Sequence, residues 1–320
     1  MDNKAVVTRD DVLNAAERIA SAVVRTPLME ARLGGHKLWL KCESLQTGGA
    51  FKLRGASNRL LQLSADERAR GVVAFSSGNH ALGVAIAARR LGIAATIVMP
   101  SDAPGLKVDG TRAQGAQIIF YDRRTESREA IAARLASETG AIVVPSFDDP
   151  DIVAGQGTAG LEIADQLAEA GAGAPARIVI PCGGGGLAAG IALACPKADI
   201  VIVEPEGWND MARSLEGGTI VPVAQDAPST LCDALQTPLV SPITFEILRR
   251  RKAIALYVSD SEVEAAVRWV YNEVGLVVEP GGAAALAALL AGKVDLIPDT
   301  VLLLSGGNVD PALHARIISG

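Results

Sequence analysis

The segment that decides the fold is RIVIPCGGGGLAAGIALA, residues 177–194. A short apolar run leads into four consecutive glycines, and a helix-forming run follows them. A strand that turns sharply into a helix is the repeating unit of an α/β protein. Four glycines let the backbone turn tightly and point several N–H groups at one place. Together with the helix N-terminus they predict an anion site, most naturally for a phosphate.

Two other interpretations of this loop stay open. Gly183, Gly185 and Ala188 match the dinucleotide fingerprint G-x-G-x-x-A. Glu204 ends the next predicted strand, where that fingerprint places an acidic residue. The match is weak alone and lies in the middle of the chain, so an NAD-dependent oxidoreductase is a remote alternative. A flexible turn is the other interpretation, although turns rarely need four glycines.

Strands and helices alternate on both sides of this segment. Apolar runs predict strands at residues 37–41, 72–75, 95–99, 117–120, 141–144, 177–180, 200–203 and 300–304. Helical spacing predicts helices at residues 79–91, 127–137, 155–170, 187–194 and 283–291, and an N-terminal helix between a capping box at Thr8 and Pro27. Residues 145–151 and 207–242 are expected to be irregular. Nearly continuous apolar strands imply an α/β fold with open, twisted, mostly parallel sheets.

The composition excludes several classes of protein. The chain has 320 residues, of which 49% are hydrophobic and 21% charged, so disorder and coiled coil describe it poorly. At about 150 residues per domain, this length corresponds to roughly two domains. The net charge is −6 and aromatic residues make up 3%. These values argue against nucleic acid or an anionic membrane as the main partner.

The cysteines and the N-terminus indicate a compartment. Cys42, Cys182, Cys195 and Cys232 form no CxxC pair and have no metal-finger spacing, as in a reduced intracellular protein. The first residues lack the apolar core of a signal peptide, and apolar runs stay shorter than the ~18 residues that span a bilayer. We therefore expect a cytoplasmic protein without a membrane segment.

Three further motifs border predicted strands and helices. Residues 48–55, GGAFKLRG, place Lys52 where a helix N-terminus and desolvation disfavour an ammonium, which suits a Schiff-base amine. Residues 76–80, SSGNH, offer hydroxyls, an amide and N–H groups for a carboxylate. Residues 305–308, SGGN, put Ser305 at the carboxyl end of a strand, where α/β sheets bind ligands. A solvated lysine, a helix cap and a polar turn are the ordinary alternatives. Together with the phosphate loop, the motifs match the needs of pyridoxal phosphate.

In this order, the motifs resemble those of the fold type II pyridoxal-phosphate enzymes, which are similar in fold to tryptophan synthase β. The match is specifically to the serine/threonine dehydratase and serine racemase family, and it extends from residue 25 to residue 310. The resemblance implies pyridoxal 5′-phosphate as cofactor and removal of water and ammonia from L-threonine, L-serine or a related β-hydroxy amino acid. Serine racemase and 3-hydroxyaspartate dehydratase are the nearest alternatives, and a non-enzymatic cofactor binder is a third.

The resemblance also implies roles for individual residues. Lys52 would carry the cofactor and act as general base, and Ser77 would be the acid/base on the opposite face in a racemase. Asn79 would meet the phenolic oxygen of the cofactor and Ser305 its pyridine nitrogen. The expected cofactor-binding residues are Phe51, Lys52, Asn79, Gly183, Gly184, Gly185, Gly186, Leu187 and Ser305. The expected substrate-binding residues are Ser76, Ser77, Gly78, His80 and Arg128.

A cation site is implied by the same resemblance. Glu204, Asp210 and the backbone carbonyl of Trp208 match the segment that binds Mg²⁺ or Ca²⁺ in serine racemases and related dehydratases. Oxygen ligands suit these hard cations, and a solvated acidic pair is the alternative. Gln236 and Thr237 replace residues near the substrate in racemases, so the preferred substrate stays open.

We also predict the domain organisation. Residues 1–70 and 147–320 would form a large cofactor-binding domain, and residues 71–146 a small, inserted domain that can close over the substrate. The partner would be a small amino acid, and the family usually forms homodimers or homotetramers.

Overall fold

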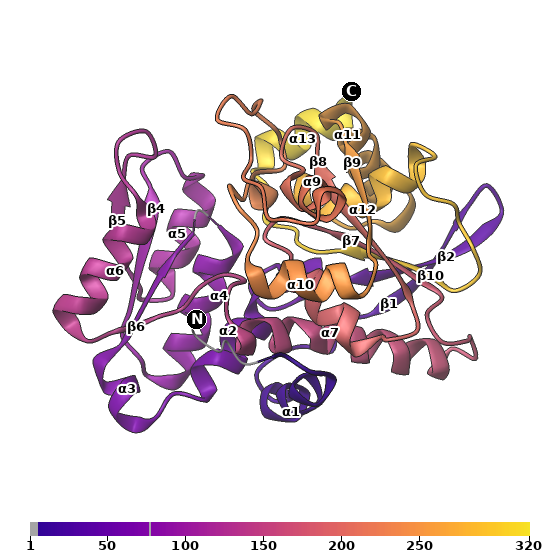
Figure 1. Ribbon diagram of the computed structural model, residues 1–320. Helices are drawn as coiled ribbons and strands as arrows, with labels where there is room; N and C mark the ends of the chain where they lie inside the picture. The colour runs from indigo at the N-terminus through magenta and orange to yellow at the C-terminus, as the bar shows by residue number, and fades with distance from the viewer. Residues whose placement is uncertain (1–5, 77) are drawn as a thin grey trace.

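The larger of two sheets lies in the right half of Figure 1. The computed structural model describes residues 6–76 and 78–320. β1 (Leu28–Leu33) is antiparallel to β2 (His36–Cys42), and all other neighbours in this sheet are parallel. The carboxyl ends of the parallel strands therefore meet at one edge. In spatial order the strands are β1 (Leu28–Leu33), β2 (His36–Cys42), β10 (Thr300–Leu304), β7 (Arg177–Pro181), β8 (Asp199–Pro205) and β9 (Ile254–Val258).

The smaller sheet lies at the left of Figure 1 and is parallel throughout. Its strands, in spatial order, are β5 (Gln117–Tyr121), β4 (Ala95–Pro100), β3 (Val72–Phe75) and β6 (Ile142–Val143). Helices α2 (Lys52–Leu61) and α4 (Asn79–Leu91) lie between the two sheets and pack on each other.

The remaining helices cover the faces of the sheets. Their starts follow from capping chemistry: Thr8, Ser64 and Ser259 each form a capping box, and Asp149 caps a helix that begins with a proline. The helices are α1 (Arg9–Ile19), α3 (Ala65–Arg70), α5 (Gly105–Ala113), α6 (Arg128–Thr139), α7 (Pro150–Glu169), α8 (Gly186–Ala194), α9 (Asp210–Gly217), α10 (Pro242–Arg250), α11 (Asp260–Trp269), α12 (Pro280–Leu290) and α13 (Pro311–Ser319). Short turns of helix are η1 (Glu43–Leu45), η2 (Asp233–Leu235) and η3 (Val270–Val274).

The predicted α/β class with mostly parallel sheets is confirmed, and each predicted strand is present. Three boundaries were wrong. The first helix ends at Ile19, well before Pro27, and α7 starts at Pro150 because Asp149 caps it there. The segment expected to be irregular, residues 207–242, contains α9.

The larger sheet is buried on both faces. Along β7, Ile178 and Ile180 point into the core beneath α7 and α8, whereas Val179 points into the core beneath α12. Successive side chains of a strand alternate between faces, so a strand covered by helices on both sides must be apolar throughout. This explains the continuous apolar runs of the sequence.

Glycines inside helices bring the site segments together. A Cβ on Gly155 of α7 would lie 2.7 Å from the Cα of Gly55 on α2. A Cβ on Gly190 of α8 would lie 2.4 Å from the carbonyl oxygen of Val153 on α7. Real Cβ atoms essentially never approach so closely, so only glycine permits these crossings. Helix α7 thereby holds the start of α2 and the start of α8 in a fixed relation.

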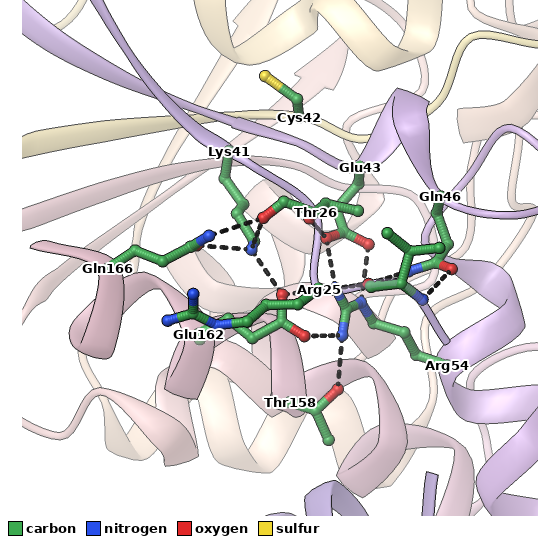
Figure 2. Close-up of polar contacts among 12 residues, drawn as sticks. Arg25, Thr26, Lys41, Cys42, Glu43, Gln46, Arg54, Thr158, Glu162 and Gln166 are labelled. Atoms are coloured by element: carbon green, nitrogen blue, oxygen red, sulfur yellow. Dashed lines mark hydrogen bonds and ion pairs between the residues drawn. The ribbon is translucent and has the colours of Figure 1, made fainter. Parts of the chain in front are cut away.

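A buried ion cluster also holds α2 (Figure 2). We call Lys41, Glu43, Arg54 and Glu162 the Arg54 cluster. The Arg54 guanidinium forms bonds of 2.8 Å to both carboxylate oxygens of Glu43, and bonds of 2.6 and 2.8 Å to those of Glu162. Lys41 Nζ lies 2.6 Å from Glu162 Oε2 and 2.7 Å from the carbonyl oxygen of Thr26. Two positive and two negative side chains thus satisfy one another.

We compared the length and apolarity of the helices with those that a membrane span requires. Within residues 6–76 and 78–320, none combines the length and the apolarity that crossing a bilayer requires.

Candidate active site

A pocket opens where carboxyl ends of strands from the two sheets face each other. Phe75 ends β3, Pro181 ends β7 and Ser305 follows β10, and all three line this pocket. It also contains every described residue that the sequence predicts to bind cofactor or substrate. These residues are Phe51, Lys52, Ser76, Gly78, Asn79, His80, Arg128, Gly183, Gly184, Gly185, Gly186, Leu187 and Ser305. Ser77, the remaining predicted residue, lies outside the described residues.

Lys52 is the first residue of α2, and its side chain reaches into the pocket. Its Nζ donates a hydrogen bond of 3.0 Å to the backbone carbonyl oxygen of Ser146, and it lies 5.0 Å from the ring centroid of Phe51. Burial lowers the pKa of Lys52 to about 8. At pH 7 roughly a tenth of the side chain is then the neutral, nucleophilic amine, compared with almost none for an ordinary lysine.

His80 lies on the first turn of α4 and is only 2% exposed. Its Nε2 lies 2.9 Å from the backbone carbonyl oxygen of Val144. A carbonyl can only accept, so Nε2 carries the hydrogen and Nδ1 bears the lone pair. Burial, together with the nearby charge of Lys52, lowers the pKa of His80 to about 3. The ring is therefore neutral at physiological pH and has no N–H left for a substrate carboxylate.

The glycine loop forms a cradle at the start of α8. Gly185 is the N-cap residue, with φ of +85°, and Gly186 begins the helix. A Cβ on Gly184 would lie 2.3 Å from the ring of Phe147, and a Cβ on Gly183 would lie 2.9 Å from Thr237 Oγ1. The loop is thus packed so closely that only bare backbone fits. The free N–H groups of a helix N-terminus and its positive dipole end favour an anion at this place.

Asn79 and Ser305 approach the pocket from opposite sheets. The Asn79 amide nitrogen donates a short hydrogen bond to Glu279 Oε1, and its oxygen accepts one of 2.8 Å from Asn308 Nδ2. Ser305 is 5% exposed, and its carbonyl oxygen accepts a hydrogen bond of 3.2 Å from the N–H of Phe51. These hydrogen bonds connect the SGGN motif to both the SSGNH motif and the lysine motif, so that the three form one wall of the pocket.

Three charged residues of the pocket were missed by sequence analysis. Lys107 of α5 lies 2.5 Å from Asp233 Oδ2 and 3.4 Å from Glu279 Oε2. Burial alone would lower the pKa of Lys107, but the two carboxylates outweigh it and raise that pKa. Lys107 and Asp233 lie in segments that carry no recognisable motif. For Glu279, the following Pro-Gly-Gly was a usable sign of a helix start.

Arg128 begins α6 and lines the pocket with Ser76 and Gly78. Its guanidinium lies 5.5 Å from the ring centroid of Phe75, and its Nε lies 2.8 Å from Glu129 Oε1. The backbone N–H of Gly78, the N-cap residue of α4, donates a hydrogen bond of 3.2 Å to Ser76 Oγ.

The predicted cation ligands lie outside the pocket lining, behind the glycine loop. Glu204 accepts hydrogen bonds of 3.0 and 2.8 Å from the N–H groups of Met211 and Ala212. Burial raises the pKa of Glu204 to about 8 and that of Asp210 to about 6. Trp208 donates its indole N–H to the carbonyl oxygen of Pro228 at 2.7 Å. Among residues 6–76 and 78–320, no group of three or more His, Cys, Asp or Glu side chains could hold a metal by itself.

Comparisons with known proteins agree with this geometry. The model of the pyridoxal-phosphate dependent enzyme family matches residues 19–306. The L-threo-3-hydroxyaspartate ammonia-lyase of Saccharomyces cerevisiae is 42% identical over 98% of this chain and 97% of its own. The serine racemase of Schizosaccharomyces pombe is 38% identical over 99% of both chains. A solved threonine deaminase from T.th. has a TM-score of 0.87 and 43% identity, covering 94% of this chain and 98% of its own.

The residues present fit pyridoxal phosphate. Its aldehyde needs an amine of lowered pKa, which Lys52 provides. Its phosphate needs backbone N–H donors without side-chain obstruction, and a Cβ at Gly183, Gly184 or Gly185 would clash with the surrounding wall.

Proposed function

Because the chain belongs to the family of pyridoxal-phosphate dependent enzymes, we propose that its substrate is L-threo-3-hydroxyaspartate. The protein is a pyridoxal-phosphate-dependent ammonia-lyase of a β-hydroxy amino acid, as its relatives indicate. The sequence alone favours L-threonine or L-serine. The observation that shifts the proposal to a dicarboxylic substrate is Arg128, a cation of the pocket besides Lys52, which would hold the cofactor, and Lys107, whose carboxylate partners also line the pocket.

We propose the following division of labour among the pocket residues. When bound, pyridoxal phosphate joins an amine through a Schiff base and withdraws electrons from the bonds at the substrate Cα. Lys52 would hold the cofactor and remove the α-proton, a role that its lowered pKa supports. The backbone N–H groups of residues 183–186 would bind the phosphate. Ser305 would face the ring nitrogen, and Asn79 the phenolic oxygen.

The substrate's two carboxylates would bind at different places. The turn formed by Ser76 and Gly78, together with the start of α4, would hold the α-carboxylate through N–H and hydroxyl groups. The His80 side chain does not suit this task, because its only N–H donates to Val144. Arg128 would hold the side-chain carboxylate. Its ion pair with Glu129 is no obstacle, because Glu129 is 56% exposed and can turn into solvent.

Release of 2-oxo acid tests this proposal. We expect turnover of L-threo-3-hydroxyaspartate with a higher kcat/KM than L-serine or L-threonine. Arg128→Met should raise the KM for the dicarboxylic substrate about 30-fold or more, because a charge-assisted bond is lost, and leave the KM for L-serine within about threefold. Arg124→Met is the matched control, since Arg124 is 87% exposed and pairs with Asp122. An equal loss for both substrates would contradict the assignment of Arg128.

Racemisation of serine is the second candidate activity. Similarity to a serine racemase over the whole chain and the presence of Ser77 in the SSGNH motif support it. Formation of D-serine from L-serine by the wild-type protein, and its loss in Ser77→Ala with dehydration retained, is the expected result. Equal loss of both activities would argue against an acid/base role for Ser77.

We also propose that Glu204, Asp210 and the backbone carbonyl of Trp208 bind Mg²⁺ or Ca²⁺. Both carboxylate oxygens of Asp210 are buried and form no ion pair among the described residues. Backbone N–H groups of Val240 and Met211 act to lower its pKa, but burial outweighs them. A buried, unpaired carboxylate is costly unless it is protonated or meets a cation. Met211 packs against the glycine loop, so a cation here would stiffen the phosphate cradle and take no part in bond breaking.

The division into a large domain, residues 1–70 and 147–320, and a small mobile domain, residues 71–146, stays our proposal. The ion pairs from Lys107 to Asp233 and Glu279 would then join the two domains across the pocket. We propose a homodimer or homotetramer, which light scattering would test.

A further inference from the structure

We propose that His80 Nδ1 accepts a hydrogen bond from Lys52 Nζ whenever this amine is released from the cofactor. His80 would thus be a positioning residue for the proposed base, and the inference rests on the role proposed above for Lys52. The starting observation is that His80 Nδ1 is buried and has no hydrogen-bond partner among the described residues. A buried acceptor without a partner is costly, and one that lines the active-site pocket can be satisfied by a group that moves within it.

His80 lies on the face of α4 that packs against the start of α2, where Lys52 is located. Gly83 follows His80 by one helical turn, so the two residues share one face of α4. A Cβ on Gly83 would lie 3.1 Å from the carbonyl carbon of Lys52 and 3.2 Å from the N–H nitrogen of Leu53. The face of α4 that carries His80 is therefore pressed against the backbone of Lys52.

The segment after β6 holds both side chains. Val144 accepts the hydrogen bond from His80 Nε2 at 2.9 Å, and Ser146 accepts the one from Lys52 Nζ at 3.0 Å. In an extended segment, backbone groups two residues apart point in the same direction, and the residue before Pro145 favours this conformation. The imidazole and the amine thus approach neighbouring carbonyls of one short segment, and both line the same pocket.

The tautomer of His80 makes it a suitable acceptor. Its Nε2–H is committed to Val144, so the ring is anchored and Nδ1 has a fixed position. The four-carbon stem of Lys52 lets Nζ move between the Ser146 carbonyl, the cofactor and Nδ1. A neutral amine has two N–H groups and one lone pair. If Ser146 and His80 accept the two N–H groups, the lone pair is directed away from both.

The consequence for the reaction is orientation. A base whose lone pair has a fixed direction needs no reorganisation before it removes the α-proton. After removal, the ammonium form has two acceptors, so His80 also stabilises the protonated state and thereby raises the pKa of the released Lys52. His80 itself takes no proton. The other charged side chains that line the pocket are Lys107, Arg128, Asp233 and Glu279, and in the structure each of the two cations has a carboxylate partner.

Two substitutions of the holoenzyme separate the two nitrogens of the ring. His80→Gln keeps a donor near Nε2 for Val144 but removes the acceptor at Nδ1. His80→Asn keeps an acceptor near Nδ1 but gives up the bond to Val144. The readout is the pH profile of kcat, whose acid limb reports protonation of the released amine.

We expect His80→Gln to lower kcat about tenfold and to move the acid limb down by roughly one pH unit, because the ammonium loses an acceptor. His80→Asn should keep the position of the wild-type acid limb. Equal shifts in both variants, a shift in the Asn variant alone, or no shift in either would overturn the proposal. The wild-type enzyme tests the proposed function separately, through its release of 2-oxo acid and the absorbance band of a lysine-bound cofactor.

A second measurement needs no His80 variant and no turnover. The chain has three histidines, so long-range ¹⁵N NMR of the holoenzyme can resolve His80. Glycine, which has no leaving group, releases Lys52 from the cofactor. We expect the Nδ1 resonance to move upfield when glycine is added to the wild-type holoenzyme, and to stay in place in Lys52→Ala. A proton found on Nδ1, or a resonance that glycine leaves unchanged, would overturn the proposal.

Discussion

Two buried polar groups of residues each include one side chain of α2, and they differ in how completely their members are hydrogen-bonded or ion-paired. In the Arg54 cluster, each carboxylate of Glu43 and Glu162 receives bonds of 2.6 to 2.8 Å from Arg54 (Figure 2). Only two residues earlier, Lys52 Nζ donates to a backbone carbonyl at 3.0 Å, and His80 Nδ1 has no partner among the described residues.

The difference separates a structural site from a chemical one. Buried charged groups that pair with one another have no free donor or acceptor for a ligand, and their pairing fixes the packing around them. A buried polar atom without a partner is costly, and where it lines a pocket a bound ligand can satisfy it. The lowered pKa of Lys52 belongs to the second situation, since burial acts on it without a neighbouring carboxylate to compensate. Four predictions test this contrast, starting from the largest effect.

Lys52→Ala should abolish the chemistry and spare the fold. Loss of the base alone should lower kcat by about 10² to 10⁴-fold, and loss of the cofactor linkage should remove the absorbance band of a lysine-bound cofactor. The Tm of the apoenzyme should change little, because Lys52 has a single hydrogen bond to lose. A variant with wild-type absorbance and turnover would remove Lys52 from the site.

Arg54→Met should lower the stability of the fold and spare the chemistry of the site. It leaves the fully buried Glu43 carboxylate without its ion-pair partner, and breaking such a pair costs about 3–5 kcal/mol of unfolding free energy. Urea unfolding measures this loss. The matched control is Arg25→Met, whose ion pair with Glu169 is 2.7 Å long but 47% and 62% exposed, so its loss should stay within about 1 kcal/mol.

The two substitutions together define the comparison. Folded Arg54→Met should still form the lysine-bound cofactor band, whereas Lys52→Ala should keep the stability that Arg54→Met loses. Similar losses of unfolding free energy for Arg54→Met and Arg25→Met would show that the Arg54 cluster stabilises the fold no more than an exposed ion pair does.

The sequence predicted the elements that carry local signals. Eight strands were visible as apolar runs. Those of β7, β8 and β10 are buried on both faces, whereas β5 and β6, the edges of the smaller sheet, are apolar but only partly buried. β1 was missed because it is an edge strand whose residues alternate with exposed charges such as Glu30 and Arg32. β9 was missed as well, and it is the other edge of the larger sheet, with Ile254 and Tyr257 exposed.

The pocket residues likewise divide into those with a local sequence signal and those without one. The motif residues could be predicted because each motif combines a strand end, a glycine turn and a helix start within a few residues. Lys107 could not, because its partners Asp233 and Glu279 are 126 and 172 residues away in the chain. Some glycines serve packing, which the sequence does not reveal. Gly55, Gly155 and Gly190 lie within helices and permit close helix crossings.

Gly184→Ala should weaken cofactor binding at the glycine loop and leave the Arg54 cluster unaffected. The new Cβ would lie 2.3 Å from the Phe147 ring, so the loop or the ring must move. We expect the Kd for pyridoxal phosphate to rise about tenfold or more, since a shifted loop loses aligned N–H donors. Gly217→Ala on α9 is the matched control, because nothing lies within 4 Å of its Cβ position. Similar Kd values for both variants would exclude the cradle as the phosphate site.

The smallest effect concerns Asp210, a buried carboxylate that forms no ion pair among the described residues and lies behind the pocket. If it binds a cation, Mg²⁺ or Ca²⁺ at about ten times its Kd should stabilise the protein by about 1.4 kcal/mol, which corresponds to a Tm increase of roughly 1–3 °C. Asp210→Asn should remove most of this increase, because it removes the charge that the cation neutralises. Glu216→Gln, an exposed position on the same helix, should retain it. If the Tm increase survives in Asp210→Asn, the cation binds elsewhere, and the unpaired oxygens of Asp210 need another explanation, such as a protonated carboxyl, which its raised pKa of about 6 would favour at acidic pH.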